Sequence, residues 1–186
     1  YKILRLLTLL FSIGFIFIIL SFSENIKTRM VDTTLDQIGY NKDTKYIISQ
    51  EHQDQFFTAI NMFKQNKISG VGIKNFRDLC DEEVYKSGNF SCSTHPHNIY
   101  LQFLSELGFI GFLFIFTILI IFSYKVINHF YMMTFKKKKI FNNLEICLLS
   151  SVLITLWPFG PSGNFFNNWL SIIFYLPLPI LFWSIK

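Results

Sequence analysis

Three long apolar stretches constrain the fold of this chain more than any other feature. The first, residues 3–22, holds one charged residue, Arg5, and the second, residues 107–127, holds one near its end. The third, residues 144–185, is interrupted by WPFGPSGN at 157–164. An apolar helix of about 20 residues can cross the ~30 Å hydrocarbon core of a bilayer. We therefore expect an all-α integral membrane protein, a polytopic helical bundle with about four membrane segments in this chain and a large, partly helical extracytoplasmic loop.

The bounds of these segments follow from the polar residues between the apolar runs. Membrane helices are expected at 1–22, 104–128, 144–158 and 167–186, joined by an outer loop at 23–103, a basic loop at 129–143 and a turn at 159–166. The helix at 144–158 is short, so a tilted or half-spanning segment remains an alternative there. A cleaved signal peptide is the alternative for the first run, but SFSEN lacks its cleavage pattern. Because the chain starts at Tyr1, we expect it to be the C-terminal portion of a longer protein.

The charged residues predict the orientation of the membrane segments. The stretch from Glu24 to Glu106 holds nine Lys or Arg and eleven Asp or Glu. The rest of the chain holds eight Lys or Arg, including KKKK at 136–139, and one acid, Glu145. Cytoplasmic loops carry an excess of Lys and Arg, so we expect KKKK inside and the long loop outside. The position of KKKK between two membrane segments favours a topology signal or contact with anionic membrane lipid, and we expect no nucleic-acid partner.

One part of the outer loop has the pattern of an amphipathic helix. Over about 50–65, Phe56, Ile60 and Phe63 recur at helical spacing, and Ser49 is a suitable N-cap. Such a helix can pack on the rest of the loop or lie in the membrane interface, and the sequence leaves both open.

The segment that follows carries two glycines and two cations. Gly70 and Gly72 allow tight backbone that can present amide groups to an anion. Lys74 and Arg77 add cationic donors close by. A plain turn is the simpler interpretation of G-x-G alone.

Two cysteines enclose eleven residues of the outer loop. Cys80 and Cys92 can pair in an oxidising compartment, and such a closure stabilises by about 3 kcal/mol in the loop-entropy model. The alternative is a metal site that adds His95 and His97. These spacings match no standard zinc pattern, so we expect no metal.

The stretch CSTHPHNIYLQFLSELGFIG, residues 92–111, places two histidines before the second apolar run. Thr94 as cap and Pro96 in the first turn predict a helix that begins near His95–His97. At 100° per residue, one face of that helix would carry His97, Leu101, Leu104, Gly108 and Gly111. Glycine on a membrane helix marks close approach of another helix, so we expect packing at Gly108 and Gly111. His97 would then point into the bundle, with either a structural or a functional role.

The order of these motifs resembles the O-antigen ligase and O-antigen polymerase family, membrane glycosyltransferases of bacterial surface polysaccharide assembly. An amphipathic helix is followed by Gly70-Val71-Gly72 with Phe76, then by His95 to Asn98, then by Glu106 to Gly111. The resemblance covers most of residues 1–128. It implies a multi-pass protein of the bacterial inner membrane, with its large loop in the periplasm and further N-terminal membrane helices as partners.

The resemblance also implies a reaction without a metal or other cofactor. A glycan would move from a polyprenyl-pyrophosphate lipid donor to a sugar hydroxyl. That hydroxyl belongs to the lipid A core for a ligase, or to another lipid-linked glycan for a polymerase. The matching histidine, His97, would be the base that activates the hydroxyl, with His95 and Asn98 beside it. A neutral imidazole can accept a proton at neutral pH.

The pyrophosphate of such a donor needs cations, and the sequence offers several. The family pattern has an arginine near the helix before G-x-G, but residues 49–66 contain none. His52, Lys74, Arg77 or the missing helices are therefore the candidates for this contact. A non-enzymatic polysaccharide transporter is the competing class, but it predicts charges inside the membrane helices, and these are nearly free of them.

Overall fold

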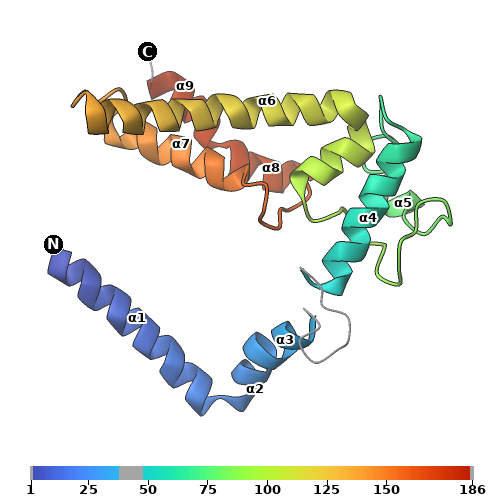
Figure 1. The fold of residues 1–186 in the computed structure, drawn as a ribbon, viewed down its shortest axis with the longest axis horizontal. Helices are drawn as coiled ribbons and strands as arrows, with labels where there is room; N and C mark the ends of the chain where they lie inside the picture. The colour runs from blue at the N-terminus through green and yellow to red at the C-terminus, as the bar shows by residue number, and fades with distance from the viewer. Residues whose placement is uncertain (1, 38–47, 185–186) are drawn as a thin grey trace. The chain divides into compact units, whose positions relative to one another are not determined.

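The fold is that of a computed structural model that describes residues 2–37 and 48–184 (Figure 1). Those residues are all-helical, with no strand among them. The chain divides into two compact units, 1–53 and 54–186, and each is described by itself. Residues 38–47 of the expected outer loop and residues 185–186 of the last expected membrane segment lie outside the described residues.

The first unit consists of one long apolar helix and three short helical segments. These are α1 (Lys2–Phe22), α2 (Glu24–Lys27), a π-helical turn η1 (Thr28–Asp32) and α3 (Thr33–Gln37). Ser23 has extended backbone between α1 and α2, and the helix axes bend there by 109°. The large apolar side chains of α1, from Ile3 to Phe22, are mostly exposed. An apolar surface of this size is typical of contact with lipid or with other membrane helices.

The second unit holds the helices that position the candidate site. In chain order they are α4 (Gln50–Gln65, which starts within the first unit), α5 (Phe76–Leu79), α6 (Ile99–Phe135), α7 (Asn143–Thr155), α8 (Asn168–Tyr175) and α9 (Pro177–Ser184). Figure 1 shows α6 and α7 side by side, and α7 makes its most extensive contacts with α9. Their shared core contains Ile115, Phe122, Leu149, Val152, Leu156 and Leu181.

The apolar runs become helices of unequal length. α6 is long and apolar enough to cross a membrane, and a second span results if Leu6–Phe22 and Glu24–Asp36 count as one bent span. α7 has 13 residues, and α8 and α9 have 8 each. The all-helical class is confirmed for the described residues together with one clear membrane-span candidate, while the count of four remains a prediction. α6 also extends to Phe135, so the expected basic loop at 129–143 is partly helical.

α6 is broken at Gly108, where the backbone has φ 66° and ψ −160°. A break of this kind frees carbonyl oxygens and amide groups that an unbroken helix would pair internally. Loop 67–72 provides their partners. Val71 N donates to Ser105 O at 2.8 Å, Gly72 N to Glu106 O at 2.9 Å, and Phe109 N to Lys67 O at 2.8 Å.

The glycines at this junction serve backbone contact between the loop and the broken helix. A Cβ on Gly108 would come impossibly close to the Ile68 carbonyl, and one on Gly70 would collide with the backbone of Glu106. A Cβ on Gly111 would meet the side chain of Leu107 in the same helix. Within the described residues, loop 67–72 is the segment nearest Gly108, and the expectation that Gly108 and Gly111 mark the approach of another helix stays a prediction.

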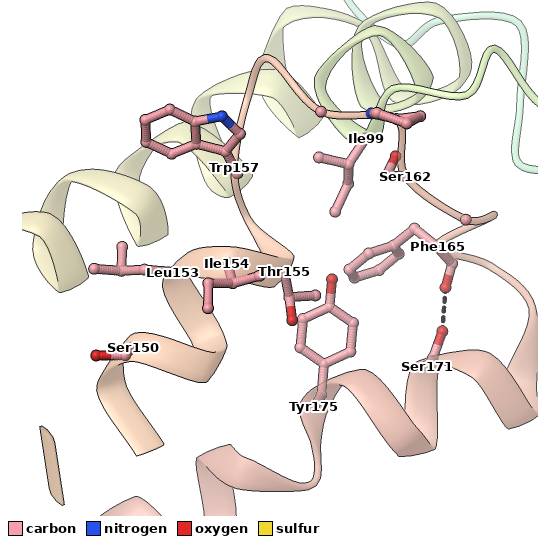
Figure 2. A pocket seen from close by; sticks show the side chains of 13 residues that line it. Ile99, Ser150, Leu153, Ile154, Thr155, Trp157, Ser162, Phe165, Ser171 and Tyr175 are labelled. Atoms are coloured by element: carbon pink, nitrogen blue, oxygen red, sulfur yellow. Dashed lines mark hydrogen bonds between the residues drawn. The ribbon is translucent and has the colours of Figure 1, made fainter. Parts of the chain in front are cut away.

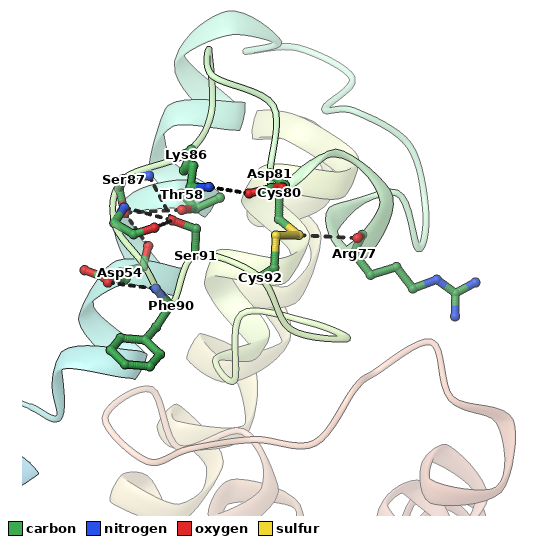
Figure 3. A network of polar contacts seen from close by, with 11 residues as sticks. Asp54, Thr58, Arg77, Cys80, Asp81, Lys86, Ser87, Phe90, Ser91 and Cys92 are labelled. Carbon is green, nitrogen blue, oxygen red and sulfur yellow. Dashed lines mark hydrogen bonds and ion pairs between the residues drawn. A yellow bond between two sulfur atoms is a disulfide. The ribbon is translucent and has the colours of Figure 1, made fainter.

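Hydrogen bonds fasten the segment after α5 to α4, and a disulfide closes that segment into a loop (Figure 3). Cys80 and Cys92 are bonded, with their Cα atoms 5.1 Å apart. At α4, the Asp54 carboxylate accepts from Phe90 N at 3.1 Å, and Ser87 Oγ donates to Asp54 O at 2.6 Å. The segment between the G-x-G loop and the histidines is thereby held against α4.

We expect Gly108→Ala to destabilise the protein. Its φ and ψ are almost exclusive to glycine, and holding another residue there costs about 1–3 kcal/mol before the clash with Ile68 is counted. The measurement is the Tm of the purified protein in detergent. Gly14→Ala is the control, because nothing lies within 4 Å of a Cβ at that position in α1. Equal Tm values for the two variants would contradict this account of the break.

Candidate functional site

The two histidines lie on a turn before α6, and we call residues 94–98 the histidine turn. α6 begins at Ile99, and the side chain of Asn98 caps it by accepting from Tyr100 N at 3.0 Å and Leu101 N at 3.1 Å. His97 has a left-handed φ of 51°. The expected helix start near His95–His97 is therefore wrong, because Asn98 is the cap and the residues before it turn sharply.

The loop between α7 and α8 holds the histidine turn in place. Ser162 N donates to His97 O at 2.9 Å, and His95 Nε2 lies 2.9 Å from Ser162 O. Asn98 Nδ2 donates to Pro158 O at 2.8 Å. These contacts fix the backbone of the turn on both sides of His97, across more than 60 residues of sequence.

Both ring nitrogens of His95 are occupied. The Ser162 carbonyl can only accept, so Nε2 of His95 carries a hydrogen and donates. In the neutral ring, Nδ1 then accepts from the Thr94 hydroxyl 2.9 Å away. Burial lowers the pKa of His95, which favours this neutral form, although the bond to Ser162 opposes the shift. A buried ring with both nitrogens engaged is a poor base, so His95 serves the shape of the turn.

The ring of His97 has a different environment. It is half-buried, and its centroid lies 4.2 Å from that of His95. Its Nε2 is 3.1 Å from the hydroxyl of Ser93, which can either donate or accept. The Ser93 hydroxyl can therefore donate to Nε2 of a neutral His97 ring or accept from Nε2 of a protonated one, whereas Nε2 of His95 contacts a carbonyl that only accepts.

The glycines and cations of residues 70–77 lie on a separate turn. Gly70 N donates to Asn66 O at 3.0 Å and Gly72 N donates to Glu106 O, so the idea that these amides face an anion is wrong. The side chains of Lys74 and Arg77 are exposed, and Arg77 Nε lies 3.6 Å from Asp78 Oδ1. Within the described residues, no direct hydrogen bond or ion pair joins either cation to the histidine turn.

His52 belongs to the first unit, so its position relative to the histidine turn is not described. Its Nδ1 is 2.6 Å from the hydroxyl of Ser49, and its backbone N–H donates to the same hydroxyl at 3.4 Å. Ser49 therefore contacts the first turn of α4 as an N-cap does. The contact between Ser49 and His52 is therefore explained by the start of the helix.

Buried polar residues on α6 are a part of the site that sequence reasoning missed. Gln102 and Glu106 are fully buried one helical turn apart, and the hydroxyl of Tyr100 donates to Leu156 O at 2.6 Å. The signal was present, because a polar pair at i and i+4 in an apolar run is costly without partners. Their partners lie in loops that local sequence patterns do not place.

A mostly apolar cavity of about 720 Å³ lies behind the histidine turn, between α7, α8 and their connecting loop (Figure 2). Ile99 and Ser162 form the part of its lining nearest the turn. Figure 2 shows Phe165 and the hydroxyl of Tyr175 directed into it.

In the part of the chain that is described, no group of three or more His, Cys, Asp or Glu could hold a metal ion.

We expect acid to weaken the folded state through His95. The pKa of His95 is lower in the folded state than the ~6.5 of the unfolded chain. As the pH decreases through this range, the unfolded chain binds more protons than the folded protein, so the free energy of unfolding decreases. The Tm should therefore drop more between about pH 7.5 and pH 5.5 in the wild type than in His95→Gln. The glutamine amide can still donate to Ser162 O but does not titrate. Equal drops would contradict a titrating, buried His95.

A family model described as O-Antigen ligase matches residues 1–116, which include the G-x-G loop, both bonded cysteines, the histidine turn and the break in α6. Neither a curated protein nor a solved structure matches the chain significantly. Because the family match extends over more than half of the sequence, the chain belongs to the O-antigen ligase family.

Proposed function

We propose that this chain forms part of a membrane glycosyltransferase of the O-antigen ligase type. It would transfer a glycan from a polyprenyl-pyrophosphate donor to a sugar hydroxyl, such as one on the lipid A core. The family supports this class of enzyme. The observation that carries the proposal is the geometry of the histidine turn, where hydrogen bonds hold the backbone of His97 and Nε2 of its half-buried ring lies 3.1 Å from the Ser93 hydroxyl, which can donate or accept.

In the proposed reaction, a neutral His97 takes the proton of the acceptor hydroxyl. The oxygen attacks the first carbon of the donor sugar, and the bond from that carbon to the pyrophosphate oxygen breaks. The pyrophosphate leaves on its lipid with the bonding electron pair, and His97 carries the proton away. General base catalysis of this kind contributes about 10²–10⁴-fold to a rate.

The departing pyrophosphate accumulates negative charge that fixed cations can stabilise. Arg77 and Lys74 are exposed on one short turn, so both are available to an anionic ligand. Arginine suits phosphate oxygens because its planar fork donates two parallel hydrogen bonds. We assign the donor pyrophosphate to this turn, with Arg77 as the main contact.

The contacts between loops support a periplasmic site. The charge pattern places both the long loop and the turn at 159–166 outside the membrane. Hydrogen bonds between the histidine turn and residues 158–162 require these two segments to meet at one end of the bundle. A lipid pyrophosphate lies at the headgroup level, where such an end would be found.

The proposal predicts that His97→Ala abolishes glycan transfer. The full-length parent protein would be expressed in a host that lacks its own ligase but makes lipid-linked O-antigen, and polysaccharide on the lipid A core would be read as a gel ladder. Loss of the base should reduce the ladder by at least about 100-fold. Membrane abundance, measured by immunoblot, is the control for folding.

A near-normal ladder from His97→Ala would refute the role of His97 as base. The absence of a ladder from well-expressed wild type would instead indicate the polymerase reaction. That reaction is read out by the length of the glycan on the lipid carrier.

We expect Arg77→Gln to raise the KM for the lipid-linked donor by about tenfold or more, because a hydrogen bond to a charged group contributes about 1.5–3 kcal/mol. Lys86→Gln is the matched control. Lys86 is also exposed and also pairs with a nearby acid, Asp81, but it lies within the disulfide loop. Donor KM values that change equally in the two variants would move the pyrophosphate contact away from Arg77.

A further inference from the structure

Gln102 is a fully buried amide whose nitrogen and oxygen both have hydrogen-bond partners. Its Nε2 donates to Asn164 Oδ1 at 2.8 Å and to Glu106 Oε2 at 3.2 Å. Its Oε1 accepts from Phe165 N at 3.0 Å. Burying an amide without partners would cost several kcal/mol, whereas a satisfied buried network is rigid. Three segments of the chain thus meet at one side chain.

Glu106 extends this network to the turn that carries the cations. Its Oε1 accepts from Phe76 N at 3.3 Å, at the first residue of α5, and the backbone of Lys74 also hydrogen-bonds to it. Phe76 is itself fully buried. The exposed side chains of Lys74 and Arg77 therefore start from a backbone that the Glu106 carboxylate holds against α6.

Asn164 extends the network in the other direction, to the histidine turn. Its Nδ2 donates to Thr94 O at 3.4 Å, and its Oδ1 also accepts from Phe166 N at 2.9 Å. The same loop contacts the turn through Ser162. A continuous chain of hydrogen bonds thus runs from Phe76 through Glu106, Gln102 and Asn164 to Thr94.

We infer that Gln102 is a positioning residue that sets the place of the cation turn relative to the histidine turn. This inference rests on the proposed function, in which one turn binds the donor pyrophosphate and the other carries the base. Among the described residues, no hydrogen bond or ion pair joins the side chains of Lys74 and Arg77 to the histidine turn. The separation of the two turns therefore depends on a shared support. A displacement of about 1 Å between reacting groups can cost about 10²-fold in rate.

The first test replaces the amide by an apolar side chain of similar length. Gln102→Met should lower kcat/KM for glycan transfer by about tenfold to a hundredfold in the full-length protein, by raising the donor KM and lowering kcat. Gln55→Met is the matched control. Gln55 is also buried, but its Oε1 has no hydrogen-bond partner among the described residues, so Gln55→Met breaks no hydrogen bond at that atom.

A second readout does not require activity. Hydrogen exchange followed by mass spectrometry reports the backbone N–H groups of Phe76 and Phe165, which bond to Glu106 and Gln102. In Gln102→Met, peptides over 72–79 and over 158–167 should both exchange faster than in the wild type. In Gln55→Met, both should exchange as in the wild type.

A third test separates positioning from general stability by rescue. Gln102→Glu places a second carboxylate next to Glu106, and Glu106→Gln alone removes the charge that Gln102 and Phe76 contact. Both single variants should lose kcat/KM. The double variant restores the amide–carboxylate pair between positions 102 and 106 with its direction reversed, but a carboxylate at 102 cannot donate to Asn164 Oδ1. It should therefore recover only in part, with a loss smaller than the sum of the two single losses.

The outcomes separate this inference from the proposed function. Additive losses in the double variant, or faster exchange in only one of the two peptides, would overturn the positioning role. Undiminished kcat/KM in Gln102→Met would do the same. If the wild type transfers no glycan but both peptides loosen in Gln102→Met, the proposed function fails while the coupling of the two turns stands.

Discussion

The break of α6 at Gly108 is the constraint on which the rest of the site depends. An apolar helix that stops pairing its own backbone must find other partners for the freed groups, since bare amides and carbonyls are costly away from water. Loop 67–72 supplies them at Ser105, Glu106 and Phe109. The G-x-G loop thus provides the hydrogen bonds that the broken helix lacks. The backbone that leads to Lys74 and Arg77 is therefore held in place at α6.

The same end of α6 holds the polar groups that an apolar bundle would otherwise exclude. Gln102 and Glu106 lie in the turns before the break, where two loops can reach them. Each makes hydrogen bonds to backbone and to side chains, which offsets the cost of burial. The contacts to Asp54 hold the intervening segment to α4, and a disulfide closes that segment into a loop. Two loops far apart in sequence are therefore seated on one helix end.

Sequence patterns located the helices better than they located the site. Hydrophobic runs and periodicity indicated the all-helical class, and α1 and α4 lie at the expected positions because their signals are local. The start of α6 was misplaced because Thr94 and Pro96 mimic a cap, while Asn98, the real cap, stands immediately before the apolar run. The left-handed backbone at His97 has no local signature, since bulky residues rarely adopt it. The hydrogen bonds from residues 94–102 to 156–165 cross about 60 residues, so no short pattern predicts them.

The loop that seats the histidine turn comes late in the chain. Residues 158–164 follow both α6 and α7, and the family match ends at residue 116. During translation, His95 and His97 therefore leave the ribosome well before Ser162, whose carbonyl and amide groups hold them, has been added to the chain. During synthesis the turn must wait, without these partners, until α7 and the loop after it have entered the bundle. The contacts that hold the histidine turn can therefore form only after residues 158–164 have been made.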